Sequence, residues 1–117
     1  MITTQDWPAE WLRGVLELCV LRVLADGPTY GYQISARLAS GGLGTVKGGT
    51  LYPLLKRFEE GGRVQTEWLP GDGGPGRKYY TLTDHGREVL AERSAQWRAF
   101  TQMTETMLEH APQKEQT

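Results

Sequence analysis

Basic side chains gather in the middle third of this 117-residue chain. Residues 47–80 contain six Lys and Arg against four Asp and Glu, whereas residues 1–46 and 81–117 are both net negative. A local cationic patch can attract a polyanion even though the whole chain has a formal charge of -1. The chemistry that this region predicts is therefore phosphate binding. The cations concerned are Lys47, Lys56, Arg57, Arg77 and Lys78.

Residues that could support catalysis or bind a metal are sparse. His85 and His110 lie far apart in the sequence, and Cys19 is the only cysteine. Neither a nucleophile elbow nor a metal-ligand spacing appears, and the glycine clusters do not follow a strand-then-helix order. The sequence argues against an enzyme, and we expect no metal and no cofactor. Cys19 is interpreted as a small buried hydrophobic residue, with a redox switch as the alternative.

The apolar periodicity predicts two helices in the first third of the chain. Residues 11–25 carry an apolar stripe so wide that this helix should lie at the centre of the core. It is expected to end at Gly27-Pro28, because glycine can adopt the left-handed cap and proline cannot continue the helix. The next helix is expected to begin with Thr29 as its N-cap and to stop in the glycine cluster at 41–49.

A third helix is expected over residues 50–60, where four apolar side chains recur at helical spacing. A polar, basic and partly aromatic face is left on its opposite side. This face consists of Thr50, Tyr52, Pro53, Lys56 and Arg57. In an arbitrary domain Lys56 and Arg57 would simply be a solvated surface, and the Tyr52 ring could pack while its hydroxyl stays wet.

After Gly61 the apolar period changes from 3.6 to 2, which predicts β-structure. Residues 63–81 are interpreted as a two-stranded antiparallel hairpin with an extended tip at 69–76. Arg77 and Lys78 stand at the base of this hairpin. They could contact DNA, or they could be edge-strand charges that discourage aggregation.

Thr83 should cap a last helix that runs to about Glu109, a length of roughly 39 Å at 1.5 Å per residue. The remaining chain is too short to cover the apolar stripe on this helix. We therefore predict a homodimer built mainly on this segment. The interface residues are expected to be Leu90, Trp97, Phe100, Met103, Met107 and Leu108.

Three helices followed by a hairpin are the order of a winged helix-turn-helix, whose third helix enters the major groove. The predicted fold class is mainly α with a small β-hairpin: a winged helix-turn-helix followed by a long C-terminal dimerisation helix. Residues 1–82 would form the DNA-binding domain with its N-terminal helix, 83–111 the dimerisation helix and 112–117 a polar tail.

Three blocks of the sequence closely resemble the PadR family of transcriptional regulators. They are PTYGY at 28–32, GGTLYPLLKRFEEGG at 48–62 and GGPGRKYYTLTDHG at 73–86, within a resemblance that covers about residues 11–108. The resemblance implies a winged-helix dimeric repressor that binds an inverted-repeat operator in double-stranded DNA. In such regulators a small molecule often releases the operator.

The resemblance also implies roles for individual residues. Thr50, Tyr52, Pro53, Lys56 and Arg57 correspond to the recognition-helix face. The backbone contacts of the wing correspond to Arg77, Lys78 and Tyr79, and the tyrosines of the second helix to Tyr30 and Tyr32. This chain has Lys47-Gly48-Gly49 where the family usually has a capping residue.

A ligand site is a further expectation, because some PadR-like proteins have an aromatic pocket. Aromatic side chains paired across a two-fold axis could hold a flat aromatic effector. The residues expected to line this pocket are Trp7, Trp11, Trp97 and Phe100. The alternative is a well-filled dimer core.

The N-terminus is polar and the longest apolar run has four residues, so we expect a cytoplasmic protein without a membrane segment. A rival function is a winged-helix protein-interaction module that does not bind DNA, which the near-neutral charge would suit. Salt discriminates between the two functions, because only DNA binding requires a steep dependence of affinity on salt concentration.

Overall fold

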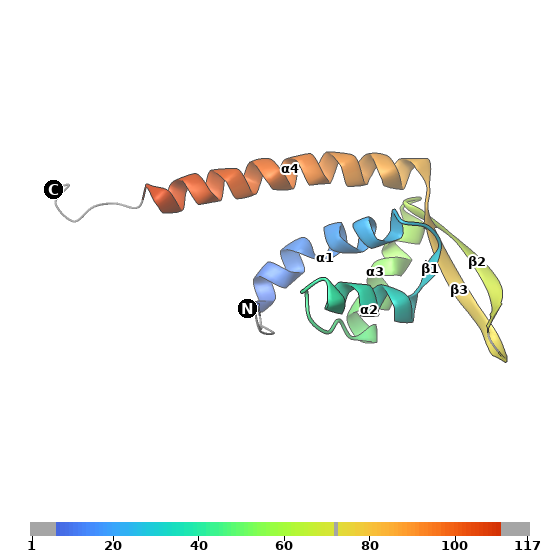
Figure 1. Ribbon diagram of the computed structural model, residues 1–117. Coiled ribbons are helices and arrows are strands. Elements are labelled where there is room, and N and C mark those ends of the chain that lie inside the picture. The colour runs from blue at the N-terminus through green and yellow to red at the C-terminus, as the bar shows by residue number, and fades with distance from the viewer. Residues whose placement is uncertain (1–6, 72, 111–117) are drawn as a thin grey trace.

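The helices and strands follow one another in the order of a winged helix-turn-helix (Figure 1). The computed structural model describes residues 7–71 and 73–110. In chain order, its elements are α1 (Ala9–Leu24), β1 (Thr29–Tyr30), α2 (Gly31–Ser40), α3 (Gly48–Glu60), β2 (Val64–Gly71), β3 (Gly74–Leu82) and α4 (Asp84–Glu109).

The core lies between α1, α2, α3 and the base of the sheet. The prediction that the first helix is central is confirmed, because α1 contributes five buried residues. Val20, Leu24, Ile34 and Leu55 have no exposed surface at all. Their side chains come from three different helices, so removal of apolar surface from water holds these helices together.

An ion-pair cluster joins the end of α1 to α2. The Asp26 carboxylate is 2.8 Å from Arg22 and also pairs with Arg37. Hydrogen bonds from these two guanidinium groups hold the pKa of Asp26 below its ordinary value of 3.8. The Arg37 side chain additionally donates to the Val23 carbonyl, at 3.3 Å.

The sheet has one strand more than the sequence predicted. Thr29 and Tyr30 form β1 and pair with Tyr80 and Tyr79 of β3, which gives the strand order β1-β3-β2. The expectation that Thr29 caps the second helix is therefore wrong. Its backbone is extended along β3, its side chain is buried, and α2 begins two residues later.

The wing consists of β2 and β3, and its strands reach further than expected. They pair from Val64 opposite Leu82 to Gly71 opposite Gly74, with an irregular register between Leu69 and Gly71. The extended tip predicted at residues 69–76 is wrong, because most of these residues belong to the strands. The backbone pairing tolerates the glycines and prolines of this segment.

α3 begins at Gly48, two residues before the predicted start, and ends at Glu60 as expected. The amide groups of Thr50 and Leu51 donate to the Lys47 carbonyl, each at 2.9 Å, which adds an early turn. Pro53, which would lie in the first turn of a helix that begins at residue 50, consequently lies in the second turn. Because proline has no N–H, it leaves the carbonyl of Gly49 without its usual helical partner.

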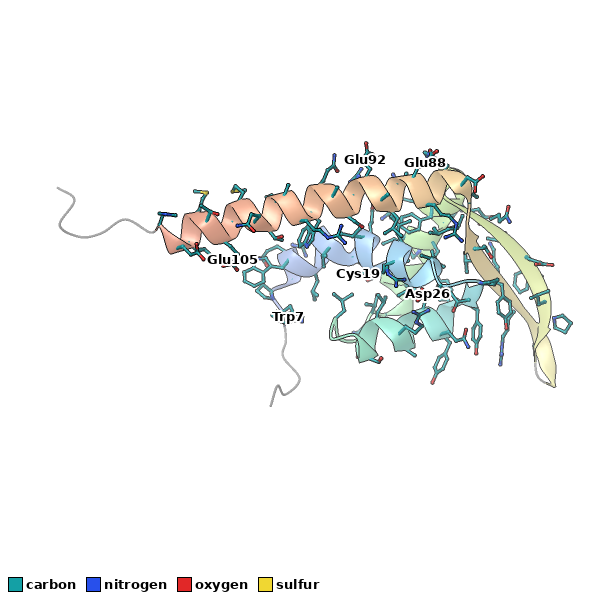
Figure 2. The ribbon with its side chains drawn as sticks, turned by 45° about the horizontal axis from the view of Figure 1, so that its top comes forward. Trp7, Cys19, Asp26, Glu88, Glu92 and Glu105 are labelled. Atoms are coloured by element: carbon teal, nitrogen blue, oxygen red, sulfur yellow. The ribbon has the colours of Figure 1, made fainter. Side chains whose placement is uncertain are left out.

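α4 is capped by Thr83 as predicted, with the Thr83 hydroxyl accepting from the Gly86 amide at 3.0 Å. A Cβ at residue 86 would collide with the carbonyl of Arg63, so only glycine lets α4 start this close to the wing. The helix then runs alongside α1 and continues past the end of the body (Figure 1). Glu88 and Glu92 point away from the body (Figure 2).

Within the described residues, none of the helices has the length and apolarity needed to cross a membrane. The predicted polar tail at 112–117 lies outside the described residues. The division of the chain between residues 82 and 83 stays a prediction.

Candidate nucleic-acid interface

α3 has one buried side and one exposed side. The buried side consists of Leu51, Leu54, Leu55 and Phe58. The opposite side carries the five residues expected to contact DNA, all of them exposed: Thr50, Tyr52, Pro53, Lys56 and Arg57. Lys47, directly before the helix, is exposed as well. The fold therefore displays a polar and basic helix surface while its apolar surface anchors the helix in the core.

Tyr52 is both packed and accessible. Its ring lies against the first residue of α2, and a Cβ at Gly31 would collide with the Tyr52 hydroxyl. The side chain is nevertheless 52% exposed. Tyr32, on the second residue of α2, is 75% exposed beside this contact. The two alternatives for Tyr52, packing and phosphate contact, are thus compatible.

The cations of α3 differ in their partners. Arg57 turns toward α1, where its guanidinium is 3.5 Å from the Glu17 carboxylate. Glu17 also lies 3.6 Å from the guanidinium of Arg63. Within residues 7–71 and 73–110, no acidic group lies within ion-pair distance of Lys47 or Lys56. These two lysines are therefore the α3 cations most available to a phosphate.

The wing residues expected to bind DNA are divided between two faces of the sheet, because successive side chains of a strand point to opposite sides. On one face the Arg77 guanidinium lies 4.5 Å from the ring centroid of Tyr30, and Tyr30 meets Tyr79 edge-on at 5.3 Å. Lys78 lies on the other face, which also carries the buried residues Val64 and Tyr80. We call this second face the inner face of the wing.

Glu59 is a residue whose role the sequence analysis missed. Its carboxylate accepts hydrogen bonds from the Lys78 ammonium at 3.2 Å and from the Thr66 hydroxyl at 3.1 Å. These bonds, that of Lys78 first, hold the pKa of the Glu59 carboxyl below its ordinary value. In the sequence Glu59 is only an acid within a basic patch, and nothing there shows that two strands converge on it.

Trp68 was also missed. It pairs across the strands with Lys78, which places it on the inner face, and its side chain is 69% exposed. The alternating pattern of β2 could have found this position, because Val64, Thr66 and Trp68 share one side of the strand. A large exposed aromatic side chain beside the basic region extends the candidate interface outward along the wing.

The four aromatic residues expected to bind a ligand do come together. They line a cleft of about 650 Å³ between the start of α1 and α4, and they are Trp7, Trp11, Trp97 and Phe100. The rings of Trp97 and Phe100 are 5.8 Å apart, and the Trp7 indole N–H donates to the Gly42 carbonyl at 2.9 Å. Glu105, also in the lining, is on the same side of α4 as Trp7 (Figure 2).

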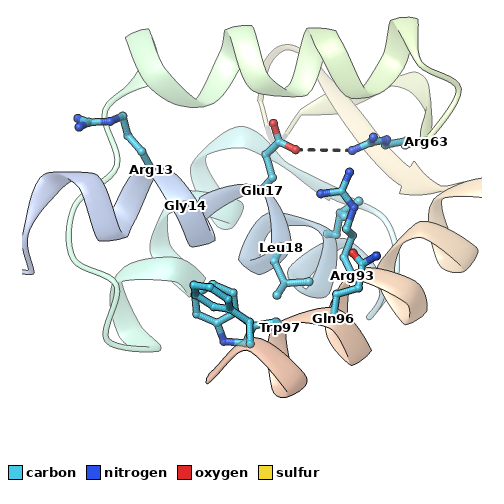
Figure 3. Close-up of a pocket in the computed structure, with 10 residues that line it drawn as sticks. Arg13, Gly14, Glu17, Leu18, Arg63, Arg93, Gln96 and Trp97 are labelled. Carbon is cyan, nitrogen blue, oxygen red and sulfur yellow. Dashed lines mark ion pairs between the residues drawn. The ribbon is translucent and has the colours of Figure 1, made fainter. Parts of the chain in front are cut away.

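A smaller cavity of about 220 Å³ lies beside this cleft, between α1, α4 and the start of the wing (Figure 3). Arg13, Arg63 and Arg93 line it together with Glu17 and Trp97. In this cavity the Glu17 carboxylate pairs with Arg63, and the same carboxylate pairs with Arg57 of α3. The surroundings of Trp97 are thus linked to α3 through one carboxylate.

The residues expected in a dimer interface lie along α4. Five of them are exposed: Trp97, Phe100, Met103, Met107 and Leu108. Leu90 instead packs partly against the core of its own chain. Within the described part of this chain, the apolar surface of the distal half of α4 is therefore largely uncovered, apart from the side of Trp97 and Phe100 that faces α1 across the cleft.

Cys19 lies mid-way along α1 and packs partly against the core. Burial raises the pKa of its thiol. A raised pKa lowers the fraction of reactive thiolate at neutral pH, which disfavours the redox alternative.

The family model described as "Transcriptional regulator PadR-like family" matches residues 20–92, which contain α2, α3 and the wing. A transcriptional regulator of Mycobacterium tuberculosis is 35% identical over 83 residues, which are 71% of this chain and 76% of that protein.

Solved structures agree with this match. A PadR family transcriptional regulator from Eggerthella lenta has 39% identity and a TM-score of 0.80, over 88% of this chain and 89% of that one. A PadR-like transcriptional regulator from Bacillus cereus has 34% identity and a TM-score of 0.76, over 85% of this chain and 96% of that one.

Proposed function

The chain belongs to the PadR-like family of transcriptional regulators, and on this basis we propose that it is a cytoplasmic, homodimeric repressor that binds an inverted-repeat operator. The observation that carries the proposal is α3 itself. Its apolar side is held in the core while the opposite side presents Tyr52 and Lys56 to solvent. This is the orientation that a helix needs to enter a major groove.

The exposed apolar residues of α4 support the proposed homodimer. Its distal half exposes Phe100, Met103, Met107 and Leu108, and a second copy of the same helix is the partner that matches this face in length and composition. Two copies would present two recognition helices whose half-sites lie about 10 bp, or a multiple of it, apart.

Selection of bound sequences from a random DNA pool at moderate salt tests the function directly. An enriched inverted repeat is expected. Lys56→Ala should then weaken binding to that operator by roughly ten- to a hundredfold, since base-edge contacts carry about this much discrimination. Arg98→Ala, which removes an exposed cation from α4, is the matched control.

Binding titrations with the selected operator at several salt concentrations address the rival function. A DNA-binding dimer that neutralises six to eight phosphates should lose affinity with a log-log salt slope of roughly -5 to -7. No enrichment in the selection, together with a flat salt dependence, would favour the protein-interaction module instead.

Relief of repression by a planar aromatic effector is supported by the aromatic cleft at α1 and α4. The cleft is wide enough for a drug-sized ligand. A panel of planar aromatic compounds should quench the tryptophan fluorescence of the wild type and have much less effect on Trp97→Phe. Equal quenching of both proteins, or none of either, would contradict this site.

A further inference from the structure

Glu59 connects the recognition helix to both strands of the wing. One carboxylate oxygen accepts from Lys78 of β3 and the other from Thr66 of β2. Within the described residues, no other side chain of α3 hydrogen-bonds to β2 or β3. A bond that involves two charged groups is stronger and more directional than a neutral one. Glu59 therefore ties three elements at one point.

This contact lies where the packed base of the wing ends. On the inner face, Val64 and Tyr80 are buried nearest the body. Lys78 and Glu59 come next and are about one third exposed, at 33% and 38% of their side chains. Trp68 lies directly opposite Lys78 on the neighbouring strand and is mostly exposed. The Glu59 carboxylate is thus the outermost tie between α3 and the wing, and the part of the wing beyond it projects from the body.

The negative charge of Glu59 is unfavourable for DNA binding. A carboxylate on a surface that meets phosphates repels them, so Glu59 weakens the general attraction to DNA. It also holds the Lys78 ammonium, which otherwise would be available to a phosphate. Glu59 thus lowers the affinity for DNA in two ways. Its position between α3 and both strands of the wing suits a different role, which is to keep the wing aligned with the helix.

We propose that Glu59 is a positioning residue: it fixes the wing against α3 and thereby raises the discrimination between operator and other DNA at the expense of total affinity. The inference rests on the proposed DNA-binding function. Phosphate contacts position a protein on the duplex and base contacts specify the sequence. A wing held at one angle makes its phosphate contacts only where α3 is in register with the operator.

Glu59→Gln and Glu60→Gln form a matched pair of variants. Both remove one negative charge from the last turn of α3, but Glu60 is exposed and makes no hydrogen bond or ion pair within the described residues. Affinities for the selected operator and for an unrelated duplex of equal length are measured by fluorescence anisotropy over a series of salt concentrations.

Glu60→Gln should raise both affinities by the same factor and leave their ratio unchanged. Glu59→Gln should raise the affinity for the unrelated duplex more, so that the ratio falls by about two- to fivefold, as expected for a partly exposed ion pair. Its salt slope for the unrelated duplex should steepen by about one per wing, because the released Lys78 can bind a phosphate.

Thr66→Val provides an independent test, because it removes one bond to Glu59 without changing any charge. It should lower the ratio while leaving the salt slope unchanged. Thermal unfolding of each variant shows whether the body remains folded. A ratio in Glu59→Gln equal to that in Glu60→Gln would overturn the inference while the DNA-binding function stands. A wild-type protein without sequence preference would overturn the proposed function and this inference with it.

Discussion

The body of the protein and its last helix bury apolar surface in opposite ways. In the body, formed by α1, α2, α3 and the sheet, the buried hydrophobic residues extend from Leu16 to Leu82 and contact one another. In α4 the one buried residue, among those described, is Gly86. The body completes its own core, whereas α4 leaves most of the apolar residues of its distal half at the surface.

The body and α4 are therefore stabilised by different contacts. A helix of this length gains little from propensity alone, and most helical stability in proteins comes from packing. Val89 and Leu90 supply that packing near the start of α4, where they touch the core. Beyond them we expect packing to come from a second chain. The stability of the body should then not depend on dimerisation, whereas the stability of the distal half of α4 should depend on it.

The largest effect that tests this contrast is expected in the body. Leu55→Ala removes a fully buried side chain and should lower the free energy of unfolding by about 2–5 kcal/mol. Urea denaturation should give the same loss at every protein concentration. Met107→Ala in α4 should destabilise only at concentrations where the protein dimerises. A Leu55→Ala loss that varies with concentration would contradict the contrast.

The next effect concerns the pair itself. Phe100→Glu places a charge in the exposed apolar face of α4 and should raise the dimer dissociation constant at least about thirtyfold, as for a central interface residue. Sedimentation velocity measures this, with circular dichroism to show that the body stays folded. Gln102→Glu introduces the same charge on the other side of the helix. A dimer that survives Phe100→Glu as well as it survives Gln102→Glu would exclude this face as the interface.

A smaller effect is expected at Glu17, which lines the cavity between α1 and α4. Glu17→Gln weakens the contact that turns Arg57 toward α1, so Arg57 becomes available to DNA. Affinity for the operator should rise by about two- to fivefold, the range expected for an exposed ion pair. Glu10→Gln removes an exposed acid of α1 and should leave the affinity nearly unchanged. Equal affinities for the two variants would show that the Glu17 contact does not restrain Arg57.

The smallest effect is a pH dependence within the body. The Asp26 carboxyl has a lower pKa when folded than its ordinary value of 3.8, so its contribution to stability is present above pH 3.8. This contribution is lost as the pH falls through the lower folded pKa. The melting temperatures of wild type and Asp26→Asn should therefore differ at pH 6 and converge in acid. The same difference at every pH would contradict the assignment.

Much of the body could be predicted from the sequence because its signals are local. The spacing of Leu51, Leu54, Leu55 and Phe58 identified both the buried side of α3 and the exposed one. Thr83 at the start of α4 gave a correct cap. β1 was not predicted because two residues are too few to show an alternating pattern. Its extended form depends on pairing with β3.

The site was harder to predict because its contacts join distant segments. Arg57 and Glu17 are separated by 40 positions, and spacing along α3 cannot show that Arg57 turns toward α1. Lys78 and Glu59 meet only after the wing has folded back on α3. The sequence therefore predicted which cations lie at the surface, but not which of them have acidic partners.

The single residue between β3 and α4 has a mechanical consequence. With only Thr83 as connection, and with Gly86 seated against the Arg63 carbonyl, the wing and α4 would pivot about a common point if the angle between them changed. A tilt of about 10° at this pivot would move the far end of a 39 Å helix by about 7 Å. In the proposed dimer, a modest change of angle at this joint would thus alter the separation of the two α3 helices by about two base-pair steps, at about 3.4 Å per step.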